Sequence, residues 1–306
     1  MLLSCSSDGG GSAASSPSRA DALTQITDEV ILPGLQASVD TTATLHTAVK
    51  DLCATPSDTT LDAARGAWGK AQGAWMATAA YRIGPIGELR SKAKIGYPIS
   101  TEKLEKHLAK DASEVGLGNI DELGADLRGL GAIEYILFTP QSLSSLAPQR
   151  CAFAEAAAAS VNNGATELSQ AWTDGYAREF KSSGQSGIDD LVNGSLAALA
   201  SVGDMALGPE AKNSGAAHRA LADAAEELGS VRAVWGDAPG GIDGLVAAKS
   251  VEAAKSFTNS LDSAIASLDD PEGAFEHVKA ARIALRTEVA SQLGVTVSFT
   301  DSDGDG

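Results

Sequence analysis

Basic residues are scarce in this chain. Among its 306 residues, 23 are lysine or arginine and 40 are aspartate or glutamate, which gives a formal net charge of −17 and an isoelectric point near 4.5. A nucleic-acid binder needs clustered Lys and Arg to displace phosphate counterions, and attraction to an anionic membrane surface needs the same. We therefore expect no nucleic-acid partner, and contact with a membrane only through a lipid anchor.

Cysteines and long apolar runs are equally rare. The three cysteines, Cys5, Cys53 and Cys151, form no CxxC pattern, so the sequence indicates neither a structural zinc site nor a disulfide scaffold. A single bridge between Cys53 and Cys151 remains open. No segment reaches the roughly 18 consecutive apolar residues that a membrane-spanning helix requires.

The N-terminus resembles a bacterial lipobox, in which a signal peptidase cuts before a cysteine that then carries lipid. Leu2 and Leu3 precede Cys5, and a flexible polar run follows. The basic and apolar regions of a complete signal peptide are not found upstream, which suggests a misplaced or internal start. We interpret 1–20 as a lipoprotein-type linker lipidated at Cys5, and we expect the protein in the periplasm or cell envelope. The alternative is an incidental cysteine in a disordered N-terminus.

Prolines number only 10 and aromatic residues make up 5% of the chain, whereas alanine is abundant. Because alanine loses no side-chain entropy in a helix, this composition favours an all-α fold. We expect two antiparallel four-helix bundles packed together, formed by 21–183 and 184–306 and joined at a small, polar, flexible segment, 182–187. Turn signals predict helices over 20–52, from Ser57 or Asp58 to Gly84, and over 120–138, 148–180, 188–207, 211–235, 242–268 and 271–293, with a short helix over 101–110 in the loop-rich stretch 83–119.

The histidines do not predict a metal or catalytic site. None of the four stands in an HxxxH or HExxH spacing, so no helix presents two imidazoles on one face, and exposed positions on polar helices account for them. A GxSxG nucleophile motif is also missing, although a Ser-His-Asp arrangement stays open because triads are spatial. We assign no catalytic residue.

Glu134 is the most informative residue of the first half. In the predicted helix 120–138 it follows Leu123, Leu127 and Leu130 at intervals of four, three and four residues, which places its carboxylate on the apolar stripe. A carboxylate there must be paired, hydrogen-bonded, protonated or bound to metal. The nearby Gly129 and Gly131 leave a notch that can admit a ligand, a water molecule or another side chain.

Arg82 is the partner that the sequence suggests for Glu134. Leu61, Trp68, Trp75 and Arg82 recur every seven residues, so Arg82 extends a tryptophan stripe that we interpret as core rather than as a cofactor site. We hypothesise that Arg82 and Glu134 meet at one end of the first bundle, beside the loop 83–97. The pair would either hold helices in register or contribute to binding, and the sequence leaves both readings open.

Several segments resemble one family. LGAIEYILF over 130–138, preceded by Gly129, looks like the signature helix of the imelysin family, also called insulin-cleaving membrane proteases. Similar segments lie at 67–85, at 94–98, which is KIGYP, and at 293–299. The resemblance covers nearly the whole chain from about Ile26 onward.

The resemblance implies an all-helical protein of two bundles, exported in bacteria, often lipid-anchored and linked to iron acquisition. The family signature GxHxxE supplies a His and a Glu once proposed as a metalloprotease site. Here the glycine is Gly129 and the glutamate is Glu134, but the histidine position is Gly131. A single carboxylate cannot hold zinc in a catalytic three-ligand site.

We interpret the chain as a non-catalytic binding protein associated with iron uptake. The expected ligand site comprises Glu134, Arg82, Gly129, Gly131 and Tyr97, with Glu134 as the candidate ligand for iron or another divalent metal. The expected partners are iron or an iron-containing ligand and iron-transport proteins of the envelope. The alternatives are a degenerate metallopeptidase and a structural interaction module.

Overall fold

The computed structural model describes residues 18–110, 120–139, 143–144, 146–208, 215–236 and 241–297. Throughout these ranges every regular element is a helix, so the predicted all-α class is confirmed. Cys5 lies outside the described residues, and its lipidation stays a prediction. Among the described helices, none combines the length and apolarity that crossing a lipid bilayer requires.

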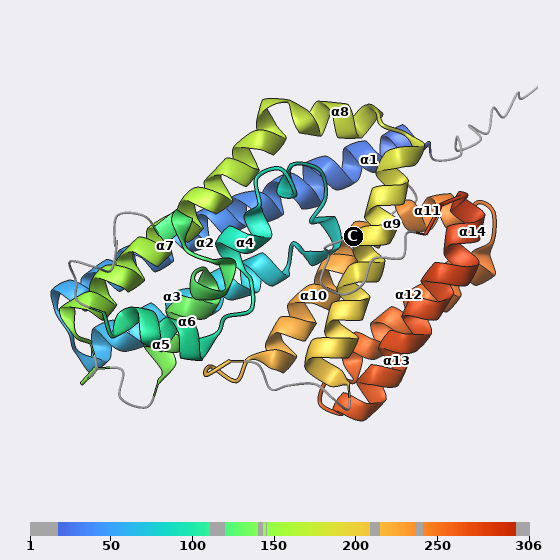
Figure 1. The fold of residues 1–306 in the computed structure, drawn as a ribbon. Coiled ribbons are helices and arrows are strands. Elements are labelled where there is room, and N and C mark those ends of the chain that lie inside the picture. Colours follow the sequence, from blue (N-terminus) through green and yellow to red (C-terminus); the bar gives the residue numbers. More distant parts are fainter. Residues whose placement is uncertain are drawn as a thin grey trace, which may run out of the picture.

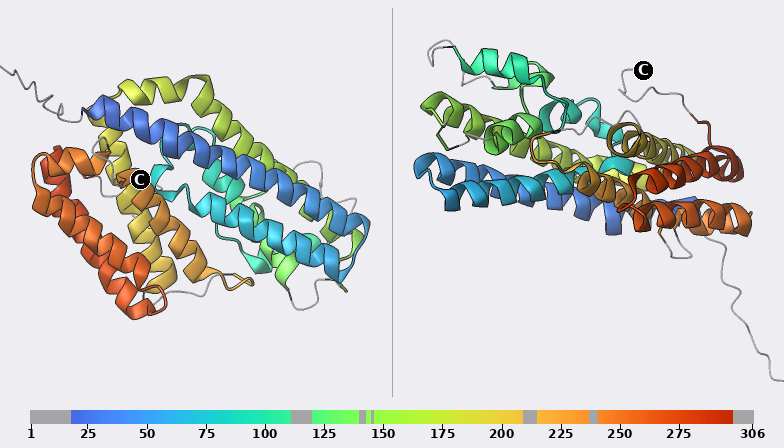
Figure 2. Two further views of the ribbon diagram at one scale, coloured as in Figure 1. Left: turned by 180° about the vertical axis from the view of Figure 1, so that it is seen from behind. Right: turned by 90° about the horizontal axis from the view of Figure 1, so that it is seen from below.

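Two long helical rods lie side by side in the first group of helices, which we define as those between residues 19 and 182 (Figures 1 and 2). Near Pro33, which has no N–H to donate, the predicted helix 20–52 is interrupted by a π-helical turn that ends at Ile31. The first rod consists of α1 (Arg19–Ile26), a π-helical turn (Thr27–Ile31) and α2 (Leu32–Ala54), and the second of α7 (Pro148–Ala171), a π-helical turn (Trp172–Tyr176) and α8 (Ala177–Ser182).

Helix α3 (Asp58–Met76) begins where the sequence predicts. The Ser57 hydroxyl accepts the Thr60 N–H and the Thr60 hydroxyl accepts the Ser57 N–H, which forms a capping box. Trp68 and Trp75 of the predicted stripe are only 2% and 1% exposed, so they belong to the core. The Trp68 indole N–H donates to the carbonyl oxygen of Leu130 over 2.9 Å and so joins α3 to α6 (Leu130–Phe138).

The second group of helices lies between residues 185 and 293. Within it, four helices pack against one another (Figure 1): α9 (Gln185–Ser201), α10 (Ala220–Trp235), α12 (Val251–Ala266) and α13 (Pro271–Ala284). The predicted helix 242–268 is wrong as one element, because Ser250 is extended and its hydroxyl caps a new helix by accepting the Ala253 N–H. The elements are α9 (Gln185–Ser201) with a π-helical turn (Val202–Leu207), α10 (Ala220–Trp235), α11 (Ile242–Ala247), α12 (Val251–Ala266), α13 (Pro271–Ala284) with a π-helical turn (Leu285–Val289), and α14 (Ala290–Leu293).

The two groups share one hydrophobic core. Buried apolar residues form a single cluster from Ala22 to Leu293. The short helical turn η2 (Ala79–Tyr81) after α3 packs against α9 and α10, and the Ala80 N–H donates to Ser230 Oγ over 3.0 Å. Helix α9 comes so close that a Cβ atom on Gly194 would lie 2.3 Å from the Ala80 carbonyl oxygen. The predicted division into domains at residues 183 and 184 stays a prediction.

A disulfide joins the two long rods at the end remote from the second group. Cys53 lies in the last turn of α2 and Cys151 in the first turn of α7, with their Cα atoms 5.5 Å apart. The bridge that the sequence left open is therefore formed. It closes a loop across a sequence separation of 98, and a loop of this length restricts the unfolded chain strongly.

Removing this bridge is expected to destabilise the protein. Replacing Cys53 and Cys151 together by serine should lower the free energy of unfolding by about 2–5 kcal/mol, as measured by urea denaturation monitored with circular dichroism. Wild-type protein kept in reductant is the control and should unfold like the double variant. Equal stability of oxidised and reduced wild-type protein would contradict the prediction.

Candidate functional site

The insertion between α3 and α6 has a different form from the one predicted. The expected helix 120–138 is wrong in its first half: Arg128 is extended, Gly129 has a φ of 81°, and α6 begins only at Leu130. The stripe through Leu123 and Leu127 is therefore not continuous with Glu134. The insertion contains η3 (Gly84–Ile86), α4 (Ser91–Ile95), α5 (Thr101–Leu108), η4 (Ile120–Glu122) and η5 (Ala125–Leu127), of which α5 matches the predicted short helix.

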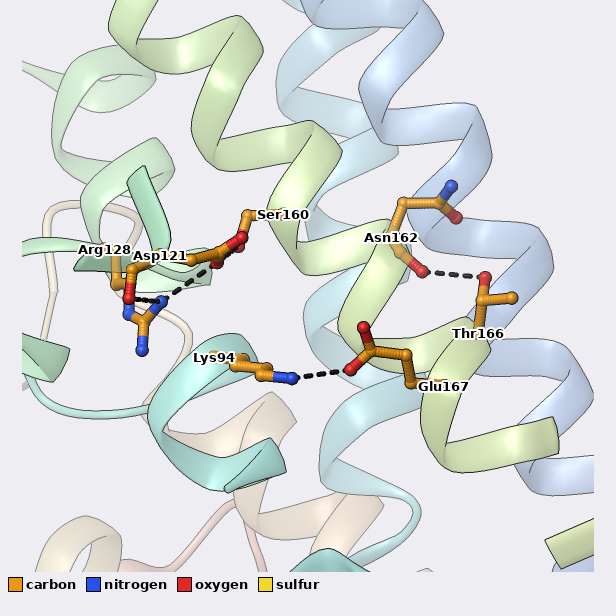
Figure 3. Close-up of polar contacts among 7 residues, drawn as sticks. All are labelled: Lys94, Asp121, Arg128, Ser160, Asn162, Thr166 and Glu167. Carbon is orange, nitrogen blue, oxygen red and sulfur yellow. Dashed lines mark hydrogen bonds and ion pairs between the residues drawn. The ribbon is translucent and has the colours of Figure 1, made fainter. Parts of the chain in front are cut away.

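Polar contacts fasten this insertion to α7 (Figure 3). Arg128, only 6% exposed, donates through Nη1 to the side chain and to the carbonyl oxygen of Asp121, both over 3.0 Å. Ser160 of α7 donates to the same Asp121 carboxylate over 2.5 Å. Lys94 of α4 pairs with Glu167 of α7 over 2.5 Å. These contacts hold the chain in place where it enters α6.

The notch at Gly129 and Gly131 is occupied by the insertion itself. A Cβ atom on Gly129 would lie 2.8 Å from the Ile95 carbonyl oxygen. One on Gly131 would lie 2.9 Å from Ile99 Cγ2 and 3.6 Å from the Tyr97 carbonyl oxygen. Of the occupants that the sequence left open, the structure places a side chain there, that of Ile99. Tyr97 is brought to Gly131 by its backbone, and the residue as a whole is 43% exposed.

Glu134 reaches across to the second group of helices. Its Oε1 atom accepts the N–H of Ala217 over 2.9 Å. The backbone of Gly215, at a φ of 95°, fits so closely against the carboxylate that a Cβ atom there would lie 2.1 Å from Oε1. His218 has a φ of 53°, a left-handed conformation that is strained for a residue with a side chain. The segment 215–219 is therefore a tight loop around the Glu134 carboxylate.

Sequence reasoning missed this loop because it predicted a helix from residue 211. The structure describes 215–219 as a turn and begins α10 at Ala220, after the left-handed His218. The signal that could have indicated a turn is Gly215, since glycine is the residue that adopts a positive φ without strain. Nothing in the local pattern indicates that the turn meets Glu134.

The expected contact between Arg82 and Glu134 is wrong. Helix α3 ends at Met76, so the seven-residue repeat does not extend to Arg82. The chain instead folds Arg82 back, with its guanidinium 4.2 Å from the centre of the Trp75 ring and Nη2 donating to the Trp75 carbonyl oxygen over 2.6 Å. The carboxylate whose charge acts on the Arg82 guanidinium is that of Glu227, in α10.

Glu227 and Arg82 make a second charged connection between the two groups. Glu227 is 8% exposed, and its Oε1 atom accepts the Ser201 hydroxyl over 3.4 Å. Burial raises the pKa of Glu227, which the charge of Arg82 opposes. Burial also lowers the pKa of the Arg82 guanidinium, and here the charge of Glu227 opposes the shift. Each side chain thus favours the ionised form of the other.

A cleft of about 760 Å³ opens beside the Glu134 loop. Its floor is the outer face of α3, and Ala217, whose N–H binds Glu134, forms part of its wall. None of the five residues of the predicted site lines it: Glu134 contacts the wall residue Ala217 from behind, and Arg82, Tyr97, Gly129 and Gly131 lie elsewhere. The lining residues are Thr41, Arg65, Gly66, Trp68, Gly69, Lys70, Gly73, Ala74, Phe138, Ala217, Arg219 and Glu226.

The surroundings of Glu134 do not supply a three-ligand metal centre. Across the described ranges, no group of three or more His, Cys, Asp or Glu side chains is arranged to hold a metal ion. Coordination of a metal by Glu134 alone stays a prediction.

The Glu134 carboxyl has a raised pKa, chiefly because of burial. The Ala217 N–H and the charges of Arg219 and His218 lower it, whereas Asp223 raises it further. A raised folded-state pKa means that the folded protein binds the proton more tightly than the unfolded chain does. This group therefore makes stability fall as pH rises from the ordinary carboxyl pKa through the raised value.

Glu134→Gln is expected to remove this pH dependence. The amide oxygen can still accept the Ala217 N–H, but the side chain no longer titrates. The stability of the variant relative to wild type should therefore increase as the pH rises above the ordinary carboxyl pKa of about 4, in a series of urea denaturations that spans this range. Glu252→Gln, at an exposed position on α12, is the control. A constant difference between Glu134→Gln and wild type across this range would contradict the shift.

Restoring the signature histidine is expected to destabilise this chain. Gly131→His brings an imidazole against Ile99, and such overpacking should cost about 1–3 kcal/mol in the free energy of unfolding. Adding Ile99→Ala should recover part of the loss. Gly66→His is the matched control, because no atom lies within 4 Å of a Cβ built at Gly66. Equal stabilities of Gly131→His and wild type would show that Ile99 moves away freely.

A family model and two solved structures match this chain. The family model described as Imelysin matches residues 31–294. A candidate iron-regulated protein A precursor from Parabacteroides distasonis ATCC 8503 has a similar structure, with a TM-score of 0.75 at 14% identity, over 92% of this chain and 95% of that one. An imelysin-like protein from Psychrobacter arcticum 273-4 has a TM-score of 0.71 at 15% identity, over 92% and 97%. No curated protein matches. The family model covers most of the chain, and the chain therefore belongs to the imelysin family.

Proposed function

We propose that this imelysin-family protein is a non-catalytic binding protein that serves iron uptake at the bacterial cell envelope. The observation that carries the proposal is the contact of Glu134 with the Ala217 N–H, because it makes the signature glutamate hold a wall of the cleft. The name of the similar P. distasonis protein supports the connection with iron, since it describes that protein as iron-regulated.

Two features favour binding over peptide hydrolysis. The signature histidine is replaced by Gly131, and Ile99 packs over that position. One Glu134 oxygen is already engaged by a backbone N–H, so this carboxylate is positioned for holding the loop 215–219. A catalytic zinc usually needs three protein ligands and an open position, a set that the described surroundings of Glu134 do not offer.

Iron would reach such a site as a complex rather than as a bare ion. A single carboxylate cannot fill the coordination sphere of iron, so the remaining donor atoms have to come from the ligand that carries the metal. Glu134 is then at most one ligand among several. This form of the proposal explains how an iron-related protein can work without a clustered set of metal-binding side chains.

The disulfide supports an extracytoplasmic location. Bridges such as Cys53–Cys151 persist in oxidising compartments and are rare in the reducing cytosol. We include a lipid anchor at Cys5 in the proposal, on the lipobox-like sequence around it. Because a single lipid signal anchors weakly, contact with envelope iron-transport proteins would help to retain the protein at the membrane.

Metal titration and a cleavage assay test this proposal together. Metal-stripped full-length protein is dialysed against ferrous ion, zinc ion and ferric citrate, and bound metal is measured. We expect saturable binding of ferric citrate, at least about tenfold weaker binding of the bare ions, and no chelator-sensitive cleavage of an unfolded polypeptide with any of these metals. Failure to bind ferric citrate, or cleavage that a chelator abolishes, would contradict the proposal, the second result in favour of a metallopeptidase.

Two substitutions separate the roles of Glu134. Glu134→Ala removes both the charge and the acceptor for the Ala217 N–H, and we expect it to weaken ferric citrate binding. Glu134→Gln keeps the acceptor and removes the charge. Binding retained in Glu134→Gln would assign Glu134 to positioning the loop, whereas equal loss in both variants would assign it to the metal. Undiminished binding in both would remove Glu134 from the site.

A further inference from the structure

The cleft beside Glu134 carries a charge opposite to that of the protein. Three cationic side chains line it, Arg65, Lys70 and Arg219, against the single carboxylate of Glu226, in a chain with a formal net charge of −17. We propose that this cleft binds a small organic or inorganic anion with two or more carboxylate or phosphate groups. The inference rests on the proposed function in that it assigns a ligand class to the same site.

Of the three cationic side chains, Lys70 has the fewest contacts with other residues. Its side chain is exposed on α3, and among the described residues it forms no ion pair or hydrogen bond. Arg65, in contrast, is oriented: its Nε atom donates to the Leu137 carbonyl oxygen over 2.9 Å, and its guanidinium lies 5.3 Å from the centre of the Phe138 ring. The ion pair of Arg65 with exposed Asp62 is long, at 3.8 Å, and leaves its charge largely uncompensated.

Arg219 is held over the floor of the cleft from the opposite side. Its Nε atom pairs with Asp223 Oδ1 over 3.2 Å, and Gln72 of α3 donates to the other oxygen of Asp223 over 2.9 Å. The two terminal nitrogens lie 3.4 and 3.5 Å from the positions that Cβ atoms of Gly69 and Gly73 would take. The guanidinium is thus fixed before any ligand arrives, which lowers the entropy cost of binding an anion.

The floor of the cleft contains a glycine, Gly66, at a position where a larger side chain would also fit. Gly66 lies inside α3, where glycine weakens a helix relative to alanine, and no atom lies within 4 Å of a Cβ built on it. The space above Gly66 is therefore open to the cleft and not filled by a neighbouring side chain. A volume of about 760 Å³ suits a small molecule, and Phe138 adds an apolar contact at the rim.

Calorimetric titration of the full-length protein with citrate and with pyrophosphate tests the inference, with sorbitol as the neutral probe. We expect saturable binding of at least one anion, weakening with added salt, and none of sorbitol. Tighter binding of citrate would identify a carboxylate ligand, and tighter binding of pyrophosphate a phosphate ligand. Lys70→Glu should weaken binding about tenfold or more, whereas Lys255→Glu, the same change at an exposed position on α12, should not.

A second pair of variants tests the location without removing a charge. Gly66→Leu should fill the floor and abolish binding, while the protein stays folded because leucine favours a helix and its Cβ atom would have no neighbour within 4 Å. Gly229→Leu, at an equally open helical glycine of α10 that does not line the cleft, should bind as wild type does. Binding that survives both Lys70→Glu and Gly66→Leu, or no binding of either anion, would overturn the inference.

The outcomes also separate the inference from the proposed function. If citrate or pyrophosphate binds in a way that depends on Lys70 but ferric citrate does not bind, the anion site is kept and the role in iron binding is rejected. Ferric citrate binding that is unchanged in Lys70→Glu and in Gly66→Leu would keep the iron-binding function and reject this cleft as its site.

Discussion

The contact between the Glu134 carboxylate and the Ala217 backbone N–H determines how the site is built. It joins α6 of the first group of helices to the loop 215–219, which directly precedes α10 in the second group. A half-buried carboxylate needs a hydrogen-bond donor or a positive charge, and here it obtains the donor directly and the charge of Arg219 in addition. Because Ala217 and Arg219 both line the cleft, the requirement of one carboxylate fixes the shape of that wall.

The sequence predicted the helices better than their junctions, and α3 shows why. Its start follows from the capping residue Ser57, and its buried face from the spacing of Trp68 and Trp75, since both signals act within one or two helical turns. Arg82 was placed by extending that spacing past Met76, where the helix ends. A periodic pattern carries no information beyond the end of its helix, so the side chain that faces Arg82, Glu227, could not be predicted.

The candidate site shows the same limit. The replacement of the signature histidine by Gly131 is visible in the sequence, and so is the need of Glu134 for a partner. Ile99 covers Gly131 from another part of the insertion, and the insertion is itself fastened to α7 through Asp121, which bonds to Ser160, 39 residues further along the chain. The partner of Glu134 is 83 residues away. Such pairings depend on the tertiary fold, and no short-range signal specifies them.

Each group of helices places one glutamate against the other group, and one of these two contacts lies beside the cleft. Glu134 of the first group is held by the second, while Glu227 of the second group faces Arg82 of the first. Arg219 belongs to both settings, because its charge lowers the pKa of Glu134 and its terminal nitrogens lie over the cleft floor. The anion site that we propose would therefore use the same Arg219 guanidinium whose charge acts on Glu134.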